Sequence, residues 1–214
     1  MTIAAIMPIK LFNERLPGKN TRILGNKPLI RYQLEALLGV GLCNSISVFC
    51  SDKSIIPLLP DGVDFIQRSP ELDLTTSNFT QIFSSFLTFV DSDIYVYVHA
   101  TAPFITVNTI NMCINAVKSG NHDSAFSAVK IQDFLWRNGQ PLNFDAANIP
   151  RSQDILPIYR ETSGVYVFLK SVFEKYQRKV GISPYICEVS FKESIDINFP
   201  DDFKLAEILL NSDL

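Results

Sequence analysis

Three cationic side chains lie close together in the stretch from Pro8 to Asn20, which reads PIKLFNERLPGKN. Lys10, Arg15 and Lys19 follow a short apolar run at residues 3–7 that predicts a first strand. Because open α/β sheets bind ligands just beyond the carboxyl ends of their strands, a basic loop at this place is suited to a chain of phosphates. A solvated basic loop without function fits the same residues, so both interpretations stay open at this point.

The elements that would position this loop alternate between strand and helix. Short apolar runs predict strands at residues 3–7, 46–50, 63–66, 94–98, 165–168, 186–189 and 194–197. Apolar residues at helical spacing predict helices at residues 28–38, 79–90, 106–120 and 169–179, and a last helix from Pro200. This alternation is typical of an α/β sandwich around a mostly parallel sheet. The 214 residues suffice for one substantial core, so we expect a single domain at residues 1–214.

The segment at residues 131–161 interrupts this alternation. It is rich in Pro, Asn, Asp and Gln and has few long apolar runs. A long irregular stretch inside a compact domain is usually functional, so we expect an arm or flap here. Its aromatic residues Phe134 and Trp136 fit either anchors of an interface or ordinary core residues.

Composition argues against several classes of function. The formal net charge is -3, which does not favour a general nucleic-acid binder or a protein that binds anionic membranes. No apolar run approaches the roughly 20 residues that cross a bilayer, and the first residues lack the features of a signal peptide. The four cysteines are scattered without a C-x-x-C pair. They favour buried, reduced thiols and a cytoplasmic location.

Six sequence blocks follow one another in an order that matches a known family. The first is the basic loop, which fits P-x-[RK]-x-x-x-x-R-[LI]-P-G-K-N and continues into residues 24–30. The others are Val48–Asp52, Arg68–Leu72, His99–Pro103, Pro150–Asp154 with Tyr159–Tyr166, and Ser194–Asn198. Together they resemble the acylneuraminate cytidylyltransferases, which make CMP-activated sialic acids and related nonulosonates. The resemblance spans nearly the whole chain and implies a Rossmann-like nucleotidyltransferase sandwich with a dimerisation arm at residues 131–161.

The resemblance also implies a reaction, in which an acceptor oxygen attacks the α-phosphorus of CTP and pyrophosphate leaves. Such chemistry depends on positioning and on neutralising charge. By resemblance, Lys10 and Lys19 are catalytic residues that contact the phosphates, and Lys10 stands where the family has Arg. The expected nucleotide-binding residues are Lys10, Asn13, Lys19, Asn20, Arg68 and His99. The residues alone leave open that Arg68 is a surface residue and that His99, in place of a Gln, is merely a packed polar side chain.

A magnesium ion is the expected cofactor, because in the family the two acids of S-I-D-I-D are tied to the metal. Asp196 is retained here, whereas Asn198 replaces the second acid. An amide oxygen can still coordinate Mg²⁺ but carries no charge. Simpler roles fit as well, namely a turn acid for Asp196 and a helix cap for Asn198.

The arm has a counterpart in the family, where it joins a homodimer and brings basic side chains to the partner's active site. Arg151 and Arg160 match such positions, and a bidentate Arg suits the carboxylate of an acceptor. We assign Gln153 to the same acceptor-binding region. One residue is inserted between Arg160 and Gly164 relative to the family pattern. This region selects the acceptor, so the acceptor is the least determined part.

Several functional hypotheses remain. The leading one is transfer of CMP from CTP to a nonulosonate for a surface glycan or lipopolysaccharide, and a close alternative uses a 3-deoxy-octulosonate or a phosphonate. The changes at Lys10 and Asn198 motivate a nucleotide-binding protein that has lost catalysis. A glycosyltransferase on a similar fold would usually carry D-x-D after a central strand, where this chain has His99-Ala100-Thr101.

Overall fold

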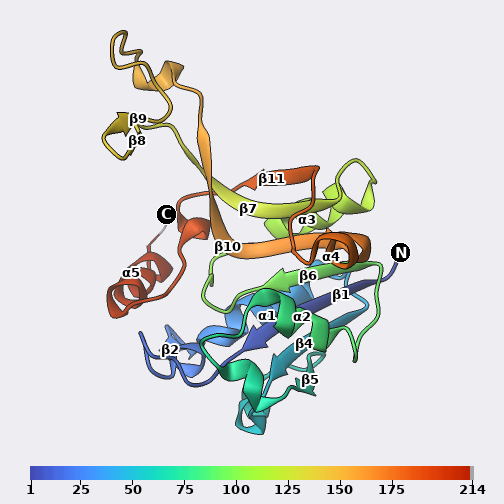
Figure 1. Cartoon of the computed structure of the whole chain (residues 1–214). Coiled ribbons are helices and arrows are strands. Elements are labelled where there is room, and N and C mark those ends of the chain that lie inside the picture. The colour runs from blue at the N-terminus through green and yellow to red at the C-terminus, as the bar shows by residue number, and fades with distance from the viewer. Residues whose placement is uncertain (213–214) are drawn as a thin grey trace.

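A seven-stranded sheet forms the centre of the computed structural model, which describes residues 1–212 (Figure 1). Its order is β11-β7-β10-β6-β1-β4-β5. The strands are β1 (Ile3–Ile9), β4 (Ser45–Cys50), β5 (Asp64–Gln67), β6 (Ile94–Val98), β7 (Ser124–Ile131), β10 (Ile158–Leu169) and β11 (Pro184–Glu188). Only β10 runs antiparallel to its neighbours in this sheet of the described chain. The prediction of a mostly parallel α/β sheet is therefore confirmed.

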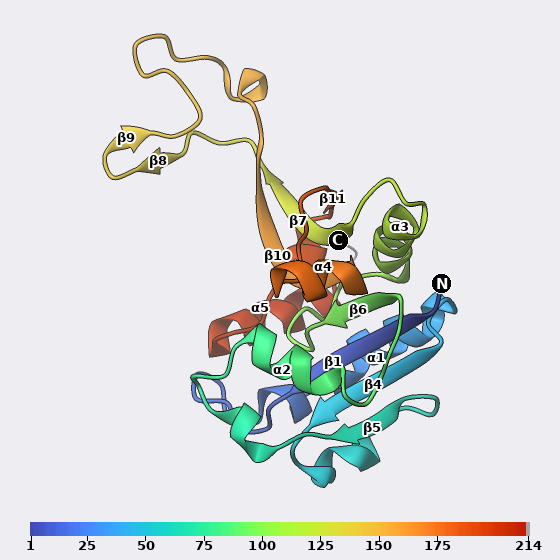
Figure 2. The ribbon, with the colours of Figure 1, turned by 45° about the vertical axis from the view of Figure 1, so that its right-hand side comes forward.

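Helices cover both faces of the sheet, because the central strands alternate apolar side chains between the two faces. Ile3, Ala5 and Met7 of β1 face the core shared with α1 (Leu29–Val40) and α3 (Val107–Lys118). Ala4 and Ile6 face the opposite core, which α2 (Phe79–Phe86) and α4 (Lys170–Tyr176) cover (Figure 2). That second core is rich in aromatic rings packed edge to face, including Phe83 on Tyr95, Phe168 and Phe173.

A third, smaller core lies between α5 (Pro200–Leu210) and the hairpin of β2 (Ile23–Leu24) and β3 (Lys27–Pro28). The strand predicted at residues 194–197 is wrong. A 3-10 helix (Lys192–Ser194) occupies its start. The residues after it make one backbone hydrogen bond to the turn that follows β6, from Ile197 N to the Thr101 carbonyl at 2.8 Å. The apolar Ile195 and Ile197 instead pack into this third core, so their alternation reflects burial without strand pairing.

Two predicted helices are shorter than their apolar patterns. Helix α2 ends at Phe86 instead of Val90, and α4 ends at Tyr176 instead of Lys179. The residues beyond α2 continue as turns in which Leu87 and Val90 still pack against the aromatic core. Burial thus extends past the point where helical hydrogen bonding stops.

An arm connects the end of β7 to the start of β10, and we define it as residues 132–157. The arm contains a small hairpin, β8 (Trp136–Arg137) with β9 (Gln140–Pro141), and a 3-10 helix (Ser152–Asp154). It stands clear of the body in both views (Figures 1 and 2). Phe134 and Trp136 pack edge-on against Phe144, with ring centroids 4.9 Å and 5.4 Å apart. Since Trp136 is 59% exposed, these rings belong to the arm and not to the main core.

Candidate active site

The carboxyl ends of the parallel strands bring the first group of expected residues together. Strands β5, β4, β1 and β6 are mutually parallel neighbours, so their carboxyl ends share one edge of the sheet. Lys10, Arg68 and His99 directly follow β1, β5 and β6, respectively. These three residues and Tyr97 line a hollow of about 310 Å³. The structure thus collects residues that lie far apart in the sequence.

The loop after β1 forms a second hollow, of about 220 Å³, which Lys10, Asn13 and Lys19 line together with Arg15. Lys10 also lines a third hollow of about 310 Å³ beside Asp73. Lys10 therefore stands where three adjoining hollows meet, and its ammonium can serve a ligand that extends through all of them.

Asparagine side chains give this loop its shape. Gly18 adopts a left-handed φ of 65°, which lets the chain turn directly into a short 3-10 helix (Lys19–Thr21). Asn20 is buried, and its Nδ2 donates to the Lys10 carbonyl at 2.8 Å. Asn13 donates to the same carbonyl at 3.2 Å, and its Oδ1 is buried without a partner. Asn20 holds the loop in this structure, and its contact with a nucleotide stays a prediction.

Lys19 reaches from this loop to the segment that carries Asp196. Its Nζ donates to the Ile197 carbonyl at 2.8 Å. Burial lowers the pKa of Lys19, and the nearby carboxylate of Asp196 opposes that shift. One oxygen of Asp196 accepts from Asn198 Nδ2 at 2.8 Å, whereas its other oxygen, Oδ1, is buried without a partner.

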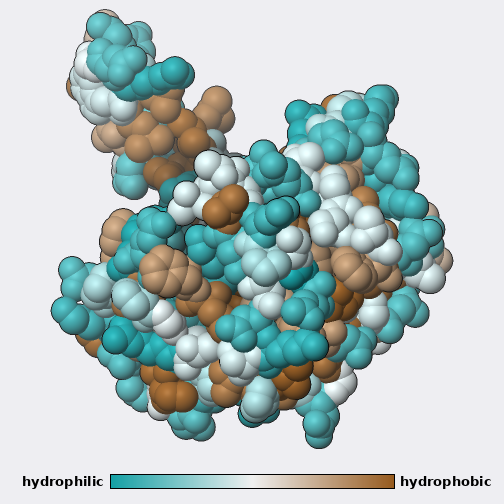
Figure 3. Space-filling view, turned by 60° about the horizontal axis from the view of Figure 1, so that its bottom comes forward, coloured by the Kyte–Doolittle hydropathy of each residue, from teal (hydrophilic) through white to brown (hydrophobic). Residues whose placement is uncertain are grey.

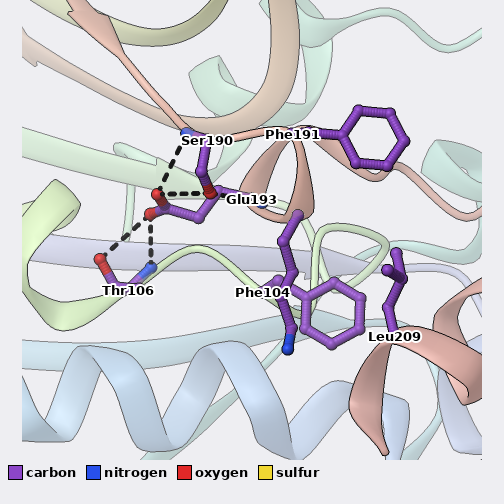
Figure 4. Close-up of a pocket in the computed structure, with 7 residues that line it drawn as sticks. Phe104, Thr106, Ser190, Phe191, Glu193 and Leu209 are labelled. Carbon is purple, nitrogen blue, oxygen red and sulfur yellow. Dashed lines mark hydrogen bonds between the residues drawn. The ribbon is translucent and has the colours of Figure 1, made fainter. Parts of the chain in front are cut away.

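Glu193 anchors the segment that holds Asp196. Its carboxylate accepts hydrogen bonds from the backbone and hydroxyl of Thr106 and from the backbone and hydroxyl of Ser190 (Figure 4). The figure shows these bonds beside a pocket of about 460 Å³ that Phe104, Phe191 and Leu209 line with apolar atoms. None of the expected nucleotide-binding residues lines this pocket. Its polar wall ties the start of α3 to the turn before Asp196.

A divalent cation fits the unpartnered oxygen of Asp196, because hard cations prefer oxygen ligands. No group of three or more His, Cys, Asp or Glu side chains suited to a metal occurs among residues 1–212. Such an ion would take most of its other ligands from phosphate oxygens and water. Asn198 points its amide nitrogen at Asp196 here, which orients that carboxylate. The assignment of Asp196 and Asn198 as metal ligands stays a prediction.

Arg68 is buried, so the interpretation as a surface residue is wrong. It is 4% exposed and pairs with Asp73, at 2.5 Å from Nη2 and 3.2 Å from Nε. Asp73 in turn accepts from the hydroxyl of Ser51, which follows β4. This pairing offsets the positive charge of Arg68 and fixes its guanidinium beside the hollow that Lys10 lines.

His99 is neutral at pH 7. Burial lowers its pKa to about 3, and the charges of Lys179 and Lys19 contribute to the same shift. Its Nε2 is buried and has no partner in the described chain. His99 can therefore exchange a hydrogen bond with a ligand but is too weak a base to take a proton at neutral pH.

The expected acceptor-binding residues lie elsewhere. Arg151 is 74% exposed by its side chain and pairs with Asp154 of the arm at 2.8 Å. Gln153 is exposed on the same turn, and Arg160 is exposed on β10 opposite Val129. None of the three lines a hollow that Lys10 lines. Within one chain the structure does not bring them to the basic loop, and their contact with an acceptor stays a prediction.

The inserted residue before Gly164 is accommodated by an irregularity in β10. The register with β7 shifts between Glu161 and Tyr166, and Ser163 adopts a left-handed φ of 55°. The hydroxyl of Ser127 provides hydrogen bonds to polar groups of this bulge. It lies 2.7 Å from the hydroxyl of Thr162 and accepts from Val165 N at 3.1 Å.

Two residues of the site were missed at the sequence level. Thr75 lines all three hollows that Lys10 lines, from the polar loop before α2. Lys179 places its Nζ 3.5 Å from the centroid of the Tyr166 ring, beside Tyr97. No pattern in the sequence marked either residue, because each reaches the site only through the packing of its loop.

The protein is thus a Rossmann-like α/β protein with a group of basic side chains at the carboxyl edge of its sheet. A family model described as "Cytidylyltransferase" matches residues 4–212, so the chain belongs to the cytidylyltransferase family. No helix in the described residues has the length and apolar character needed to cross a membrane.

Relatives of known name match most of the chain at low identity. It is 27% identical to a CMP-N,N'-diacetyllegionaminic acid synthase of Legionella pneumophila, over 98% of this chain and 97% of that protein. It is 25% identical to N-acylneuraminate cytidylyltransferase A of Danio rerio, over 96% of this chain. The chain spans about half the length (50%) of that second protein.

A solved structure shares the fold. It is the CMP:2-keto-3-deoxy-manno-octonic acid synthetase complexed with CTP, which superposes with a TM-score of 0.77 at 15% identity. The match covers 100% of both chains. The prediction of a Rossmann-like cytidylyltransferase fold is confirmed.

Proposed function

We propose that this protein transfers CMP from CTP to the hydroxyl of an acidic sugar of the nonulosonate class. The observation that carries the proposal is the position of Lys10 where three hollows meet, with Lys19 in one of them and Arg68 in another. These cations lie at the carboxyl edge of the sheet, where a triphosphate would be surrounded by positive charge. The family and the names of the relatives support CTP as the donor.

In the proposed reaction, the acceptor oxygen forms a bond to the α-phosphorus as the bond from that phosphorus to the bridging oxygen breaks. The electron pair of the broken bond leaves with pyrophosphate, and the hydroxyl proton passes to solvent. Lys10 and Lys19 neutralise the phosphate oxygens, and Asn13 offers its unpartnered amide oxygen to the nucleotide. Arg68 and His99 hold the nucleotide from the β5 and β6 side.

Magnesium belongs to the same proposal. Asp196 would hold the ion through its unpartnered oxygen, and Asn198 would orient Asp196 or add an amide oxygen. When bound, the ion supplies charge neutralisation to the phosphates. The side chains of the chain itself position the triphosphate against the acceptor.

We also propose a homodimer joined through the arm. The exposed large apolar residues between 134 and 159 are Phe134, Trp136, Leu142, Ile149, Leu156 and Tyr159. Figure 3 shows hydrophobic residues gathered on the projecting arm. Such a surface favours burial against a partner. In such a dimer, the acceptor in the partner's site would be reached by Arg151, Gln153 and Arg160.

We also propose a cytoplasmic location, which the free cysteines fit.

The acceptor has an alternative. The same reaction could use a 3-deoxy-octulosonate, the sugar class named for the solved structure, or a phosphonate. Loss of catalysis is the other alternative, since Lys10 and Asn198 replace the Arg and Asp of the family pattern.

The test is pyrophosphate release from CTP with magnesium and one acid at a time. The panel contains N-acetylneuraminate, N,N'-diacetyllegionaminate, 2-keto-3-deoxy-manno-octonate and 2-aminoethylphosphonate. We expect release with one of the first two acids and none without an acid. Release only with the octonate or the phosphonate would reassign the acceptor. CTP binding without release for any acid would support the catalytically inactive alternative.

A further inference from the structure

Lys179 holds its ammonium among aromatic rings at the same edge of the sheet. Its Nζ lies 3.5 Å from the ring centroid of Tyr166, 5.3 Å from that of Tyr97 and 5.6 Å from that of Phe79. Tyr166 and Tyr97 are register partners on β10 and β6, and each is 3% exposed. Tyr97 also lines the hollow of Lys10 and His99. The ammonium is therefore placed beside the proposed site by three separate elements.

This cation has no carboxylate partner within the described residues. No hydrogen bond or salt bridge involves Lys179 there, and its recorded contacts are those with the rings. Glu161 is the acid whose charge acts on it, but the Glu161 carboxylate accepts from the Tyr166 hydroxyl at 2.7 Å. Burial lowers the pKa of Lys179 to about 8, so the group is still mostly charged at pH 7. A partly desolvated cation of this kind is well suited to pair with an anion of a ligand.

A second polar group nearby also lacks a partner. His99 Nε2 is buried and unpaired, and the His99 ring lies 5.2 Å from that of Tyr97 and 6.3 Å from that of Tyr166. The positive charge of Lys179 acts on His99. Because the proposed function assigns His99 to the nucleotide, this nitrogen places the Lys179 ammonium directly beside the nucleotide, where the second substrate must lie.

The order of the strands separates this place from the phosphate-binding loop. Lys10 follows β1, whereas Tyr166 lies on β10, and β6 runs between these two strands. Strands are about 4.8 Å apart, so the two backbones are about 10 Å apart. A triphosphate beside Lys10 and Lys19 leaves the β6–β10 side for the other substrate. The arm also begins on this side, since β10 carries it.

We infer that Lys179 binds the acceptor, by pairing its ammonium with the acceptor's carboxylate at the β6–β10 end of the site. This inference rests on the proposed function and makes it more specific. It assigns the acceptor's negative charge to a residue of the same chain, beside any contribution from Arg151 and Arg160 of the partner subunit. An acceptor without an acidic group would leave this cation unpaired.

The experiment compares Lys179→Met, which removes the charge, with Lys179→Arg, which keeps it. Lys175→Met is the matched control, since Lys175 is exposed and its Nζ also lies over a tyrosine ring, 5.1 Å from that of Tyr176. Calorimetry would measure CTP with magnesium, and separately each acid of the panel added to protein saturated with CMP. These titrations do not depend on turnover, and retained CTP binding reports that each variant is folded.

We expect wild type to bind at least one carboxylate sugar, and Lys179→Met to weaken that binding about tenfold or more. Lys179→Arg and Lys175→Met should stay within about threefold, and CTP affinity should change less than about twofold in every variant. Unchanged acid binding in Lys179→Met would overturn the inference. Equal weakening of CTP would overturn it too, because Lys179 would then contact the nucleotide.

The outcomes also separate this inference from the proposed function. If wild type binds CTP but none of the carboxylate sugars, or only 2-aminoethylphosphonate, the carboxylate assignment fails while nucleotide binding stands. If wild type does not bind CTP, the proposed function itself fails.

Discussion

At the scale of single residues, the site depends on contacts between distant parts of the chain. Lys19 and Ile197 are 178 positions apart, yet the Lys19 ammonium donates to the Ile197 carbonyl. That contact brings a partly buried cation next to Asp196, whose one free oxygen is also buried. The charge of Asp196 stabilises the Lys19 ammonium without a direct salt bridge, which leaves both groups available for the proposed contacts with phosphates and magnesium.

Lys19→Ala should reduce kcat/KM for CTP by about 100-fold or more, because in the proposed complex it removes a positive charge that faces the phosphates. Steady-state kinetics of pyrophosphate release would measure this loss. Lys53→Ala is the control, since Lys53 is exposed and lies outside the site. Activity within about threefold of wild type would remove Lys19 from the proposed catalytic residues.

Asn198→Asp should lower the magnesium concentration needed for half-maximal activity. It would add a second carboxylate beside Asp196, in place of the amide that now donates to it. The same pair should lower the melting temperature without magnesium, because two like charges would face each other, and magnesium should restore it. A magnesium titration together with thermal unfolding would measure both. An unchanged magnesium dependence would favour a purely structural role for Asn198.

Lys179 should make stability depend on pH. Its pKa of about 8 lies below the ~10.4 of an unfolded chain, so between these values the unfolded chain binds more protons. The free energy of unfolding therefore rises with pH between these two pKa values, because the cost of burying the Lys179 charge disappears. We expect Lys179→Met to melt at a higher temperature than wild type at pH 7, and this advantage to shrink at pH 10. A variant that melts lower than wild type at pH 7 would show that the packing of the lysine outweighs its desolvation.

At the scale of elements, an irregular strand sets the wall of the site. Strand β10 shifts its register at Ser163, and the bulge lets Glu161 and Tyr166 meet through a hydrogen bond. The same strand then pairs with β6 and brings Tyr166 opposite Tyr97. The bulge thus helps to position the Tyr166 ring, whose centroid lies 3.5 Å from the Lys179 ammonium.

Gly164→Ala should destabilise the protein by about 1–3 kcal/mol. A Cβ at this position would lie 2.5 Å from Ile105 Cδ1 and 2.9 Å from Ser127 Oγ, both closer than normal contact. Urea unfolding would measure the loss, and adding Ile105→Val should recover only part of it, because valine lacks Cδ1 but keeps Cγ1, which lies 2.6 Å from the added Cβ. Ile105→Val alone is the control, and a Gly164→Ala variant as stable as wild type would show that the segment holding Ile105, just before α3, shifts to make room.

At the scale of the whole molecule, the arm exposes apolar side chains that pack against nothing in the described body. It projects from the ends of β7 and β10, and its apolar residues remain exposed in a single chain. None of the three cores of residues 1–212 includes a residue of the arm, so the apolar side chains that the arm exposes are candidates for burial against a partner.

Leu156→Arg should weaken the proposed dimer, because Leu156 is 83% exposed on the arm and a buried charge would oppose association. Sedimentation at several protein concentrations would measure the shift toward monomer. Ile182→Arg is the matched control, since Ile182 is 73% exposed on the body. Wild type that sediments as a monomer at all concentrations would contradict the homodimer.

The sequence by itself determined the alternation of strands and helices, the basic loop with Lys10 and Lys19, and the family, because these depend on local spacing and on ordered motifs. It misplaced the strand at 194–197, since burial in a small core produces the same alternation as a strand. Only the tertiary structure decided that Arg68 is buried on Asp73 and that the Lys179 ammonium lies among three aromatic rings. Both depend on packing between elements far apart in the chain, where burial and neighbouring rings, and not local pattern, set the charge environment.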